Sequence, residues 1–330
     1  MKRREFIALL GGAAVVWPLA AHPRQPDRMR RIGVLMAYSE SDSEAQAWVA
    51  AFRNGLHKLG WTQGHNIGID VRWATGDREA IERFAKELVA SPPELLLASS
   101  TPPTAALLEQ TRTIPIVFAL VSDPVGSGFV ASFAQPGGNV TGFTTMEPTM
   151  AGKWLELLKE IAPRVTRVAF LFNPPNAPYI EFYLSPFKAA APSFAVEVIA
   201  APVHDASELE SAVAAQAREQ NAGLLVWPDA FMAAHRAEIT SLLARYRLPA
   251  VSPQRVFAEG GCLLSYGSDS VDNFRRAASY VDRILKGEKP SELPIQAPVK
   301  FELVINLKAA KALGLDVPFH LQQRADGVIE

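Results

Sequence analysis

The chain alternates short apolar runs with segments of helical spacing, and this alternation most restricts its possible folds. The first series of apolar runs covers residues 31–37, 67–73, 95–97, 114–121 and 139–143. Between them, apolar residues recur every three to four positions, as in Ala45, Trp48, Val49, Phe52 and Leu56. Repeated strand and helix units of this kind predict a parallel, doubly wound α/β sheet.

A second series of the same kind begins after Met146. Its apolar runs lie at 167–172, 196–200, 223–227, 250–251 and 262–266. Two successive series in about 300 residues predict two lobes, because a single core rarely grows that large. We expect an N-terminal lobe of 29–146 plus about 267–290, and a C-terminal lobe of 147–266 plus about 291–330. Parallel sheets present the carboxyl ends of their strands to a cleft between such lobes.

The first 28 residues are interpreted as an export signal with a short linker. Lys2, Arg3 and Arg4 begin a charged segment of the twin-arginine type, and an apolar stretch follows from Ile7 to Ala21. Fifteen apolar residues are too few to span a bilayer comfortably, so we expect a leader that is cleaved near Ala21. Pro23 stands where a small residue is favoured, and an uncleaved anchor is the alternative. The predicted location is the periplasm.

The composition argues against several classes of function. The chain carries 33 basic and 34 acidic side chains and shows no basic run among aromatic residues, so no nucleic-acid partner is expected. After the leader, no apolar run is long enough for a membrane span. The six histidines lack metal-site spacing, so neither a metal nor a cofactor is expected. Cys262 is the only cysteine and is interpreted as a buried thiol.

No catalytic motif is convincing. The segment from Gly126 to Ala131 fits G-x-G-x-x-A, with Glu147 about twenty residues on, which would suit an exported nucleotide-binding enzyme. However, the Ser122 to Val125 insert separates it from its strand, and Pro136 ends the helix that it would open. There is no Walker lysine pattern and no G-x-S-x-G elbow. We therefore predict that the chain is not an enzyme.

The segment Glu94 to Thr104 is the clearest binding feature. Leu95, Leu96 and Leu97 read as a strand buried on both faces, which ends in a run of hydroxyl-bearing residues and enters a helix through two prolines. A helix start beyond a parallel strand suits an anion such as a carboxylate. The predicted donors are the helix amides and the hydroxyls of Ser99, Ser100, Thr101 and Thr104. The alternative is that these residues are ordinary helix caps.

Other polar and aromatic residues also follow the predicted strands. Asp123 and Asp229 stand where a carboxylate could receive a ligand ammonium group, although Asp beside Pro is also a common turn former. Tyr38 and Ser39 follow the first strand, and Tyr179 and Tyr266 follow or end strands of the second series. Each tyrosine could line the cleft or pack in the core.

Several motifs resemble bacterial ABC-transporter substrate-binding proteins of the group that includes tryptophan- and tyrosine-binding examples. They are the leader, Asp123-Pro124-Val125 with Gly128, the segments 136–142, 264–267 and 283–287, and Lys300 to Lys308 as the most specific. The resemblance covers nearly the whole chain and implies the type I periplasmic-binding-protein fold. Two lobes would be joined by a hinge of about three strands.

The resemblance also implies a function. The lobes would close on a small carboxylate-bearing ligand, such as an amino acid, with aromatic amino acids included, and the closed form would dock on a membrane permease. We expect a monomer. The cleft residues carried over from the family are Tyr38, Ser39, Ser99, Ser100, Thr101, Thr104, Asp123, Asn173, Asn176, Asp229 and Tyr266. A ligand-sensing subunit that presents its closed form to a receptor is the alternative, and the sequence does not separate the two.

Overall fold

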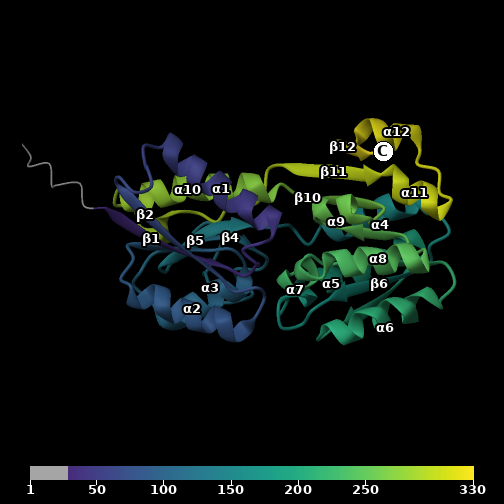
Figure 1. Cartoon of the computed structure of the whole chain (residues 1–330), viewed down its shortest axis with the longest axis horizontal. Coiled ribbons are helices and arrows are strands. Elements are labelled where there is room, and N and C mark those ends of the chain that lie inside the picture. The colour runs from purple at the N-terminus through teal and green to yellow at the C-terminus, as the bar shows by residue number, and fades with distance from the viewer. Residues whose placement is uncertain (1–28) are drawn as a thin grey trace, which may run out of the picture.

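The computed structural model describes residues 29–330, and the predicted leader and its cleavage site lie outside this range. Figure 1 shows two lobes side by side, each built on its own sheet with helices on both faces. This two-lobed α/β architecture confirms the predicted fold class. Among the described residues, no helix is long and apolar enough to cross a membrane.

The N-lobe sheet has five strands in the order β2-β1-β3-β4-β5, and every neighbouring pair is parallel. The strands are β1 (Arg30–Met36), β2 (Ile67–Trp73), β3 (Leu95–Ala98), β4 (Ile116–Val121) and β5 (Val140–Thr144). Its helices are α1 (Ser43–Lys58), α2 (Arg78–Ala90), α3 (Thr101–Gln110) and, from much later in the chain, α10 (Ser270–Leu285).

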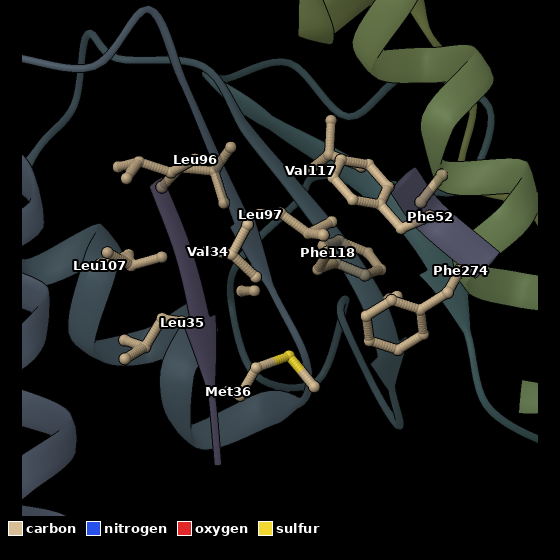
Figure 2. Close-up of a cluster of buried hydrophobic side chains, with 14 of the residues drawn as sticks. Val34, Leu35, Met36, Phe52, Leu96, Leu97, Leu107, Val117, Phe118 and Phe274 are labelled. Atoms are coloured by element: carbon tan, nitrogen blue, oxygen red, sulfur yellow. The ribbon is translucent and has the colours of Figure 1, made fainter. Parts of the chain in front are cut away.

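Every residue of β3, β4 and β5 is buried, which explains why these runs show no polar alternation. In Figure 2, side chains from β1, β3 and β4 pack with Phe52 of α1 and Phe274 of α10. Trp48 stacks on Phe274 with ring centroids 5.6 Å apart. The late helix α10 is therefore part of the N-lobe core.

The C-lobe sheet has seven strands in the order β12-β11-β10-β9-β8-β6-β7. They are β6 (Arg167–Phe172), β7 (Glu197–Pro202), β8 (Ala222–Val226), β9 (Ala250–Ser252), β10 (Leu264–Ser268), β11 (Phe301–Asn306) and β12 (Gly327–Ile329). The C-lobe helices are α4 (Met150–Ile161), α5 (Glu181–Ala190), α6 (Ala206–Ala217), α7 (Ala230–Ala234), α8 (Arg236–Tyr246), α9 (Arg255–Gly260), α11 (Leu307–Leu313) and α12 (Phe319–Arg324), with the 3₁₀ turn η1 (Ala191–Phe194). A second 3₁₀ turn, η2 (Pro290–Glu292), lies beside β5 of the N-lobe.

One strand breaks the parallel pattern that the sequence predicts. The strand β11 runs antiparallel to β10, whereas the other strand pairs are parallel. The chain leaves the C-lobe after β10, forms α10 in the N-lobe, and returns to the C-lobe at the edge from which it left. A strand that begins at this edge must run in the opposite direction to β10.

Three segments cross between the lobes: 145–149, the residue Asp269, and the stretch before β11. They are tied together, since Thr144 N donates to Gln296 O at 2.9 Å and Asp269 N donates to Lys300 O at 3.0 Å. Leu293 and Ile295 still pack in the N-lobe core, beyond the limit of 290 suggested by the sequence. We propose that the hinge consists of these three crossings and that the last of them follows Gln296.

Gly142 on β5 gives a test of the N-lobe packing. It has φ of +155°, and an added Cβ would overlap the carbonyl oxygen and ring of Phe118 on β4. We expect Gly142→Ala to lower the free energy of unfolding by about 2–3 kcal/mol, because backbone cannot move aside cheaply. Chemical denaturation measures this loss. Gly138→Ala is the matched control, since nothing lies within 4 Å of its added Cβ, and equal losses in the two variants would contradict the expected steric effect.

Candidate functional site

A small cavity lies where the strand ends of the two lobes meet. Its volume is about 30 Å³. It is lined by residues that follow strands of both sheets and by hinge residues: Tyr38, Ser100, Leu120 and Ser122 from the N-lobe, Tyr179, Trp227, Pro228, Pro253 and Gln254 from the C-lobe, and Thr145, Met146, Ser268 and Ser270 at the hinge. This is the position at which doubly wound sheets bind ligands.

A larger depression of about 620 Å³ lies elsewhere on the C-lobe. Its lining includes 160–165, 246–249 and 313–316, next to the amino ends of β6 and β9. Ligands of open α/β sheets bind at the opposite, carboxyl ends of the strands. We therefore take the interlobe cavity as the candidate site despite its small volume.

Aromatic side chains form one wall of the interlobe cavity. Trp227, directly after β8, lies 4.4 Å from Tyr183 and 6.3 Å from Tyr179 between ring centroids. Its Nε1 donates to the Tyr179 hydroxyl at 3.4 Å. On the N-lobe side, Tyr38 packs edge-on against Trp48 at 4.9 Å. Burial raises the pKa of Tyr179 to about 12 and that of Tyr38 well above its usual value, so both phenols stay neutral hydrogen-bond donors.

The hydroxyls at the start of α3 are largely used inside the N-lobe. Ser99 Oγ accepts from Ala37 N at 2.9 Å, and Thr101 Oγ1 accepts from Ser122 N at 3.3 Å. Thr104 Oγ1 donates to Ser100 O at 2.7 Å. These bonds fix the ends of β1, β3 and β4 relative to α3. Of the four predicted hydroxyl residues, Ser100 alone lies in the cavity lining.

The helix amides offer fewer donors than the sequence analysis assumed. Pro102 and Pro103 have no N–H, and Thr104 N already donates to Ser100 O at 3.1 Å. Of the backbone amides of residues 101–104, only the Thr101 N–H can therefore donate to an anion. An anion at this end of α3 therefore needs hydroxyl donors from neighbouring segments.

Asp229 is buried and bonded within the C-lobe. It caps α7 by accepting from Met232 N at 2.9 Å, and it accepts from Asn173 N at 2.8 Å. Burial raises its pKa to about 7, although these backbone donors oppose the rise. Asn173 in turn donates to Val203 O at 2.8 Å and accepts from Asn176 Nδ2 at 2.8 Å. None of the three residues lines the cavity; they hold the loops after β6 and β8 together.

The remaining predicted residues also lie outside the cavity lining. Asp123 Oδ1 accepts from Gly126 N at 2.7 Å, as a turn former does. Ser39 Oγ pairs with Ser41 Oγ at 2.9 Å. Tyr266 stacks on Phe301 at 6.2 Å within the C-lobe sheet. Of all the predicted residues, the structure brings Tyr38, Ser100 and Tyr179 together.

The sequence analysis missed several residues of the cavity lining that follow a strand or lie in one. Ser122 comes directly after β4, Trp227 directly after β8, and Gln254 two residues after β9. Leu120 lies in β4 itself, with φ of +63° and a break in the register with β5. The rule that selected Ser99 and Tyr38, a position just beyond a buried strand, would also have selected Ser122, whereas Trp227 was taken as the last residue of the run at 223–227.

The lobes contact each other directly outside this cavity. Arg236 at the start of α8 forms an ion pair with Asp42 at the start of α1, with Nη1 and Oδ2 3.4 Å apart. Ala230 and Ala233 of α7 pack into the N-lobe hydrophobic cluster. Within residues 29–330, no group of three or more His, Cys, Asp or Glu side chains is placed to hold a metal ion. The structure thus presents two lobes in contact around a neutral, aromatic and hydroxyl-lined cavity.

Comparison with known proteins identifies the family. Residues 32–329 match the family model described as ABC transporter substrate binding protein. The chain belongs to this family. Substrate-binding proteins of ABC importers are extracytoplasmic.

Similar proteins are known from both sequence and structure. The chain is 24% identical over 290 residues to a tyrosine-binding protein of Clostridioides difficile, covering 87% of this chain and 82% of the relative. An ABC domain from Streptococcus pneumoniae, solved in complex with L-Trp, superposes with a TM-score of 0.84 at 26% identity, covering 92% of this chain and all of the other. The ligand-free, open structure of a substrate binding protein from Clostridium difficile gives a TM-score of 0.68 at 24% identity, over 92% and 99% of the two chains.

Glu44 gives a pH test of the interlobe contact. It lies in the first turn of α1, where burial raises the pKa of its carboxyl to about 7, with Asp42 and Glu259 adding to the rise and Arg236 and Arg255 opposing it. Ionising this carboxyl therefore costs free energy as the pH rises from about 4.5 to about 7. Relative to Glu44→Gln, we expect the parent to lose roughly 2–3 kcal/mol of stability between pH 5 and pH 8.

Thermal or chemical unfolding at several pH values measures this difference. Asp229, which also titrates near pH 7, is present in both proteins, so its contribution cancels. Glu40→Gln changes an exposed neighbour and serves as the control. Parallel pH profiles for the parent and Glu44→Gln would refute the expected cost.

Proposed function

We propose that this chain is the solute-binding component of an ABC importer, which closes its lobes on an aromatic amino acid and delivers it to a membrane permease. The observation that carries the proposal is the cavity between the lobes. Its lining combines aromatic faces with hydroxyl groups, and these come from both lobes. A ligand that contacts both lobes binds more tightly to the closed state than to the open state, so it favours closure. A permease can then recognise the closed state.

The chemistry of the lining supports an aromatic zwitterion. Trp227, Tyr179 and Tyr38 offer ring faces and edges for stacking. No charged side chain lines the cavity, so the charged ends of an amino acid would be held by neutral hydroxyls and amides, as at Ser100, Ser122 and Gln254. The relatives that bind tyrosine and L-Trp agree with this choice of ligand.

Binding also requires the lobes to separate. Pockets for small molecules usually measure about 300–1,000 Å³, about ten times the volume of this cavity or more. We propose that the ligand enters an open form, in which the Asp42–Arg236 ion pair is broken, and that closure re-forms the interlobe contacts around it.

For the other predicted site residues we propose a supporting role. Ser99, Thr101 and Thr104 fix the start of α3, and Asp229, Asn173 and Asn176 fix the loops that carry Tyr179 and Trp227. We propose that residues 1–21 act as a twin-arginine-type leader and that the mature protein works as a monomer in the periplasm.

The ligand class is tested with the protein from Arg30 onward. A thermal-shift screen with the twenty amino acids, followed by calorimetry, should select L-tryptophan or L-tyrosine over aliphatic and acidic amino acids. A ligand at about 100 times its dissociation constant adds roughly 2.7 kcal/mol of stability. Selective shifts by leucine or by glutamate, with none from aromatic amino acids, would overturn the proposed ligand class.

A further inference from the structure

Ser122 has a buried hydroxyl with no hydrogen-bond partner among residues 29–330. The residue is 2% exposed, and its Oγ is one of three buried side-chain polar atoms within residues 29–330 that have no hydrogen-bond partner. Buried hydroxyls are nearly always bonded, so such a group in a native structure needs an explanation. Ser122 lines the interlobe cavity, where the explanation can be a ligand.

The backbone holds this hydroxyl in place at a cost. Leu120, two residues earlier, has φ of +63°, a conformation rarely adopted by a branched residue, and the pairing of β4 with β5 shifts between Ala119 and Val121. Ser122 N then donates to Thr101 Oγ1 at 3.3 Å, which fixes Ser122 beside the first residue of α3. Strained backbone of this kind persists where the surrounding structure enforces it, and it clusters at binding sites.

The neighbouring phenols do not satisfy Ser122. The Ser122 hydroxyl is near enough to the Tyr179 and Tyr183 phenols to oppose the rise in their pKa values, but burial is the larger cause and raises both. Neither phenol reaches hydrogen-bonding geometry with it. The Tyr183 O–H donates instead to Met146 O at 3.0 Å, and the Tyr179 oxygen accepts from Trp227 Nε1. The Ser122 O–H therefore remains available as a donor.

The position of Ser122 indicates the ligand group that it would meet. It stands at the positive end of the α3 dipole, which favours negative charge. That end of α3 is short of donors, because Pro102 and Pro103 lack N–H groups and Thr104 N is already bonded. An anion there would find the Thr101 amide and the hydroxyls of Ser100 and Ser122. The cavity lining contains no Lys or Arg to compete for it.

We propose that Ser122 Oγ donates a hydrogen bond to the ligand's carboxylate and so determines specificity for amino acids over their uncharged derivatives. This rests on the proposed function, since it concerns the same cleft. In this arrangement Ser122 and Ser100 replace the amide donors that two prolines remove from α3. The unpaired Ser122 hydroxyl then becomes part of a charge-assisted hydrogen bond in the complex.

The test compares the parent with Ser122→Ala, using L-tryptophan and L-tryptophanamide as probes in calorimetry. The amide keeps the indole ring and the ammonium group but lacks the negative charge. We expect the variant to bind L-tryptophan roughly 10- to 100-fold more weakly, as for a lost hydrogen bond to a charged group, and the amide with less than about a threefold change. Ser127→Ala, a serine in the same loop but outside the cavity, should leave both affinities unchanged.

Stability of the ligand-free variant gives a second readout. Removing an unpaired buried hydroxyl does not break any protein bond, so ligand-free Ser122→Ala should melt at the same temperature as the parent or higher. Weaker binding together with undiminished stability separates a ligand contact from a folding defect. A variant that melts lower would show that the hydroxyl already has a partner in the free protein, and this would overturn the proposal.

A crystal structure of the parent with L-tryptophan decides the assignment directly. We expect Ser122 Oγ within about 2.5–3.0 Å of a carboxylate oxygen. Equal losses for L-tryptophan and its amide, or a carboxylate bound at the hinge or the C-lobe, would overturn the assignment while leaving an aromatic-amino-acid-binding protein in place. Failure of the parent to bind any aromatic amino acid would instead overturn the proposed function, and this inference with it.

Discussion

The site depends on the contact between two separate sheets that meet at the carboxyl ends of their strands. Each sheet alone leaves its strand ends, with their polar loops, exposed to water. In the structure, Tyr38 and Ser122 from one lobe and Tyr179 and Trp227 from the other come together around a space large enough for little more than a water molecule. A buried hydroxyl without a hydrogen-bond partner costs free energy, and a polar ligand that bonds to it offsets this cost.

The connection between the lobes makes this contact adjustable. Because α10 belongs to the N-lobe core while β10 and β11 on either side belong to the C-lobe sheet, the chain crosses between the lobes three times. Crossings that are hydrogen-bonded to each other at Thr144, Gln296, Asp269 and Lys300 suit rotation of one lobe against the other with both cores intact. The same return path explains the antiparallel strand β11.

Much of the fold was predictable from the sequence, because buried parallel strands have a strong and local pattern. The runs at 95–97 and 114–121 coincide with β3 and β4, and Cys262 is buried, with a pKa raised to about 12 by that burial. The direction of β11 was not predictable from the sequence. It depends on the edge at which the chain re-enters the C-lobe, and the pattern of apolar residues within the strand does not reveal that edge. Within β11, Leu303 to Asn306 are all buried, so this strand does not show the alternation of a half-buried strand.

The candidate site was harder to predict than the fold. Hydroxyls after a strand look alike in sequence, whether they bond to their own backbone, as Ser99 and Thr104 do, or remain unpaired, as Ser122 does. Which of them is free depends on the backbone of neighbouring segments, such as the strained Leu120. The missing amides of Pro102 and Pro103, in contrast, were visible in the sequence, and they should have reduced the role expected of the helix amides from the start.

If ligand reaches the site only when the lobes separate, a disulfide that locks the lobes together should prevent binding. An added Cβ on Gly76 lies 3.4 Å from the Cβ of Ala230, close to the spacing of about 3.5–4.5 Å found in disulfides, and the native Cys262 is buried. The measurement is calorimetry of L-tryptophan with Gly76→Cys/Ala230→Cys, oxidised without ligand and then reduced. We expect no binding to the oxidised form and recovery on reduction. The reduced form carries the same backbone strain at residue 76 and so serves as the control. Equal binding to both forms would contradict this expectation.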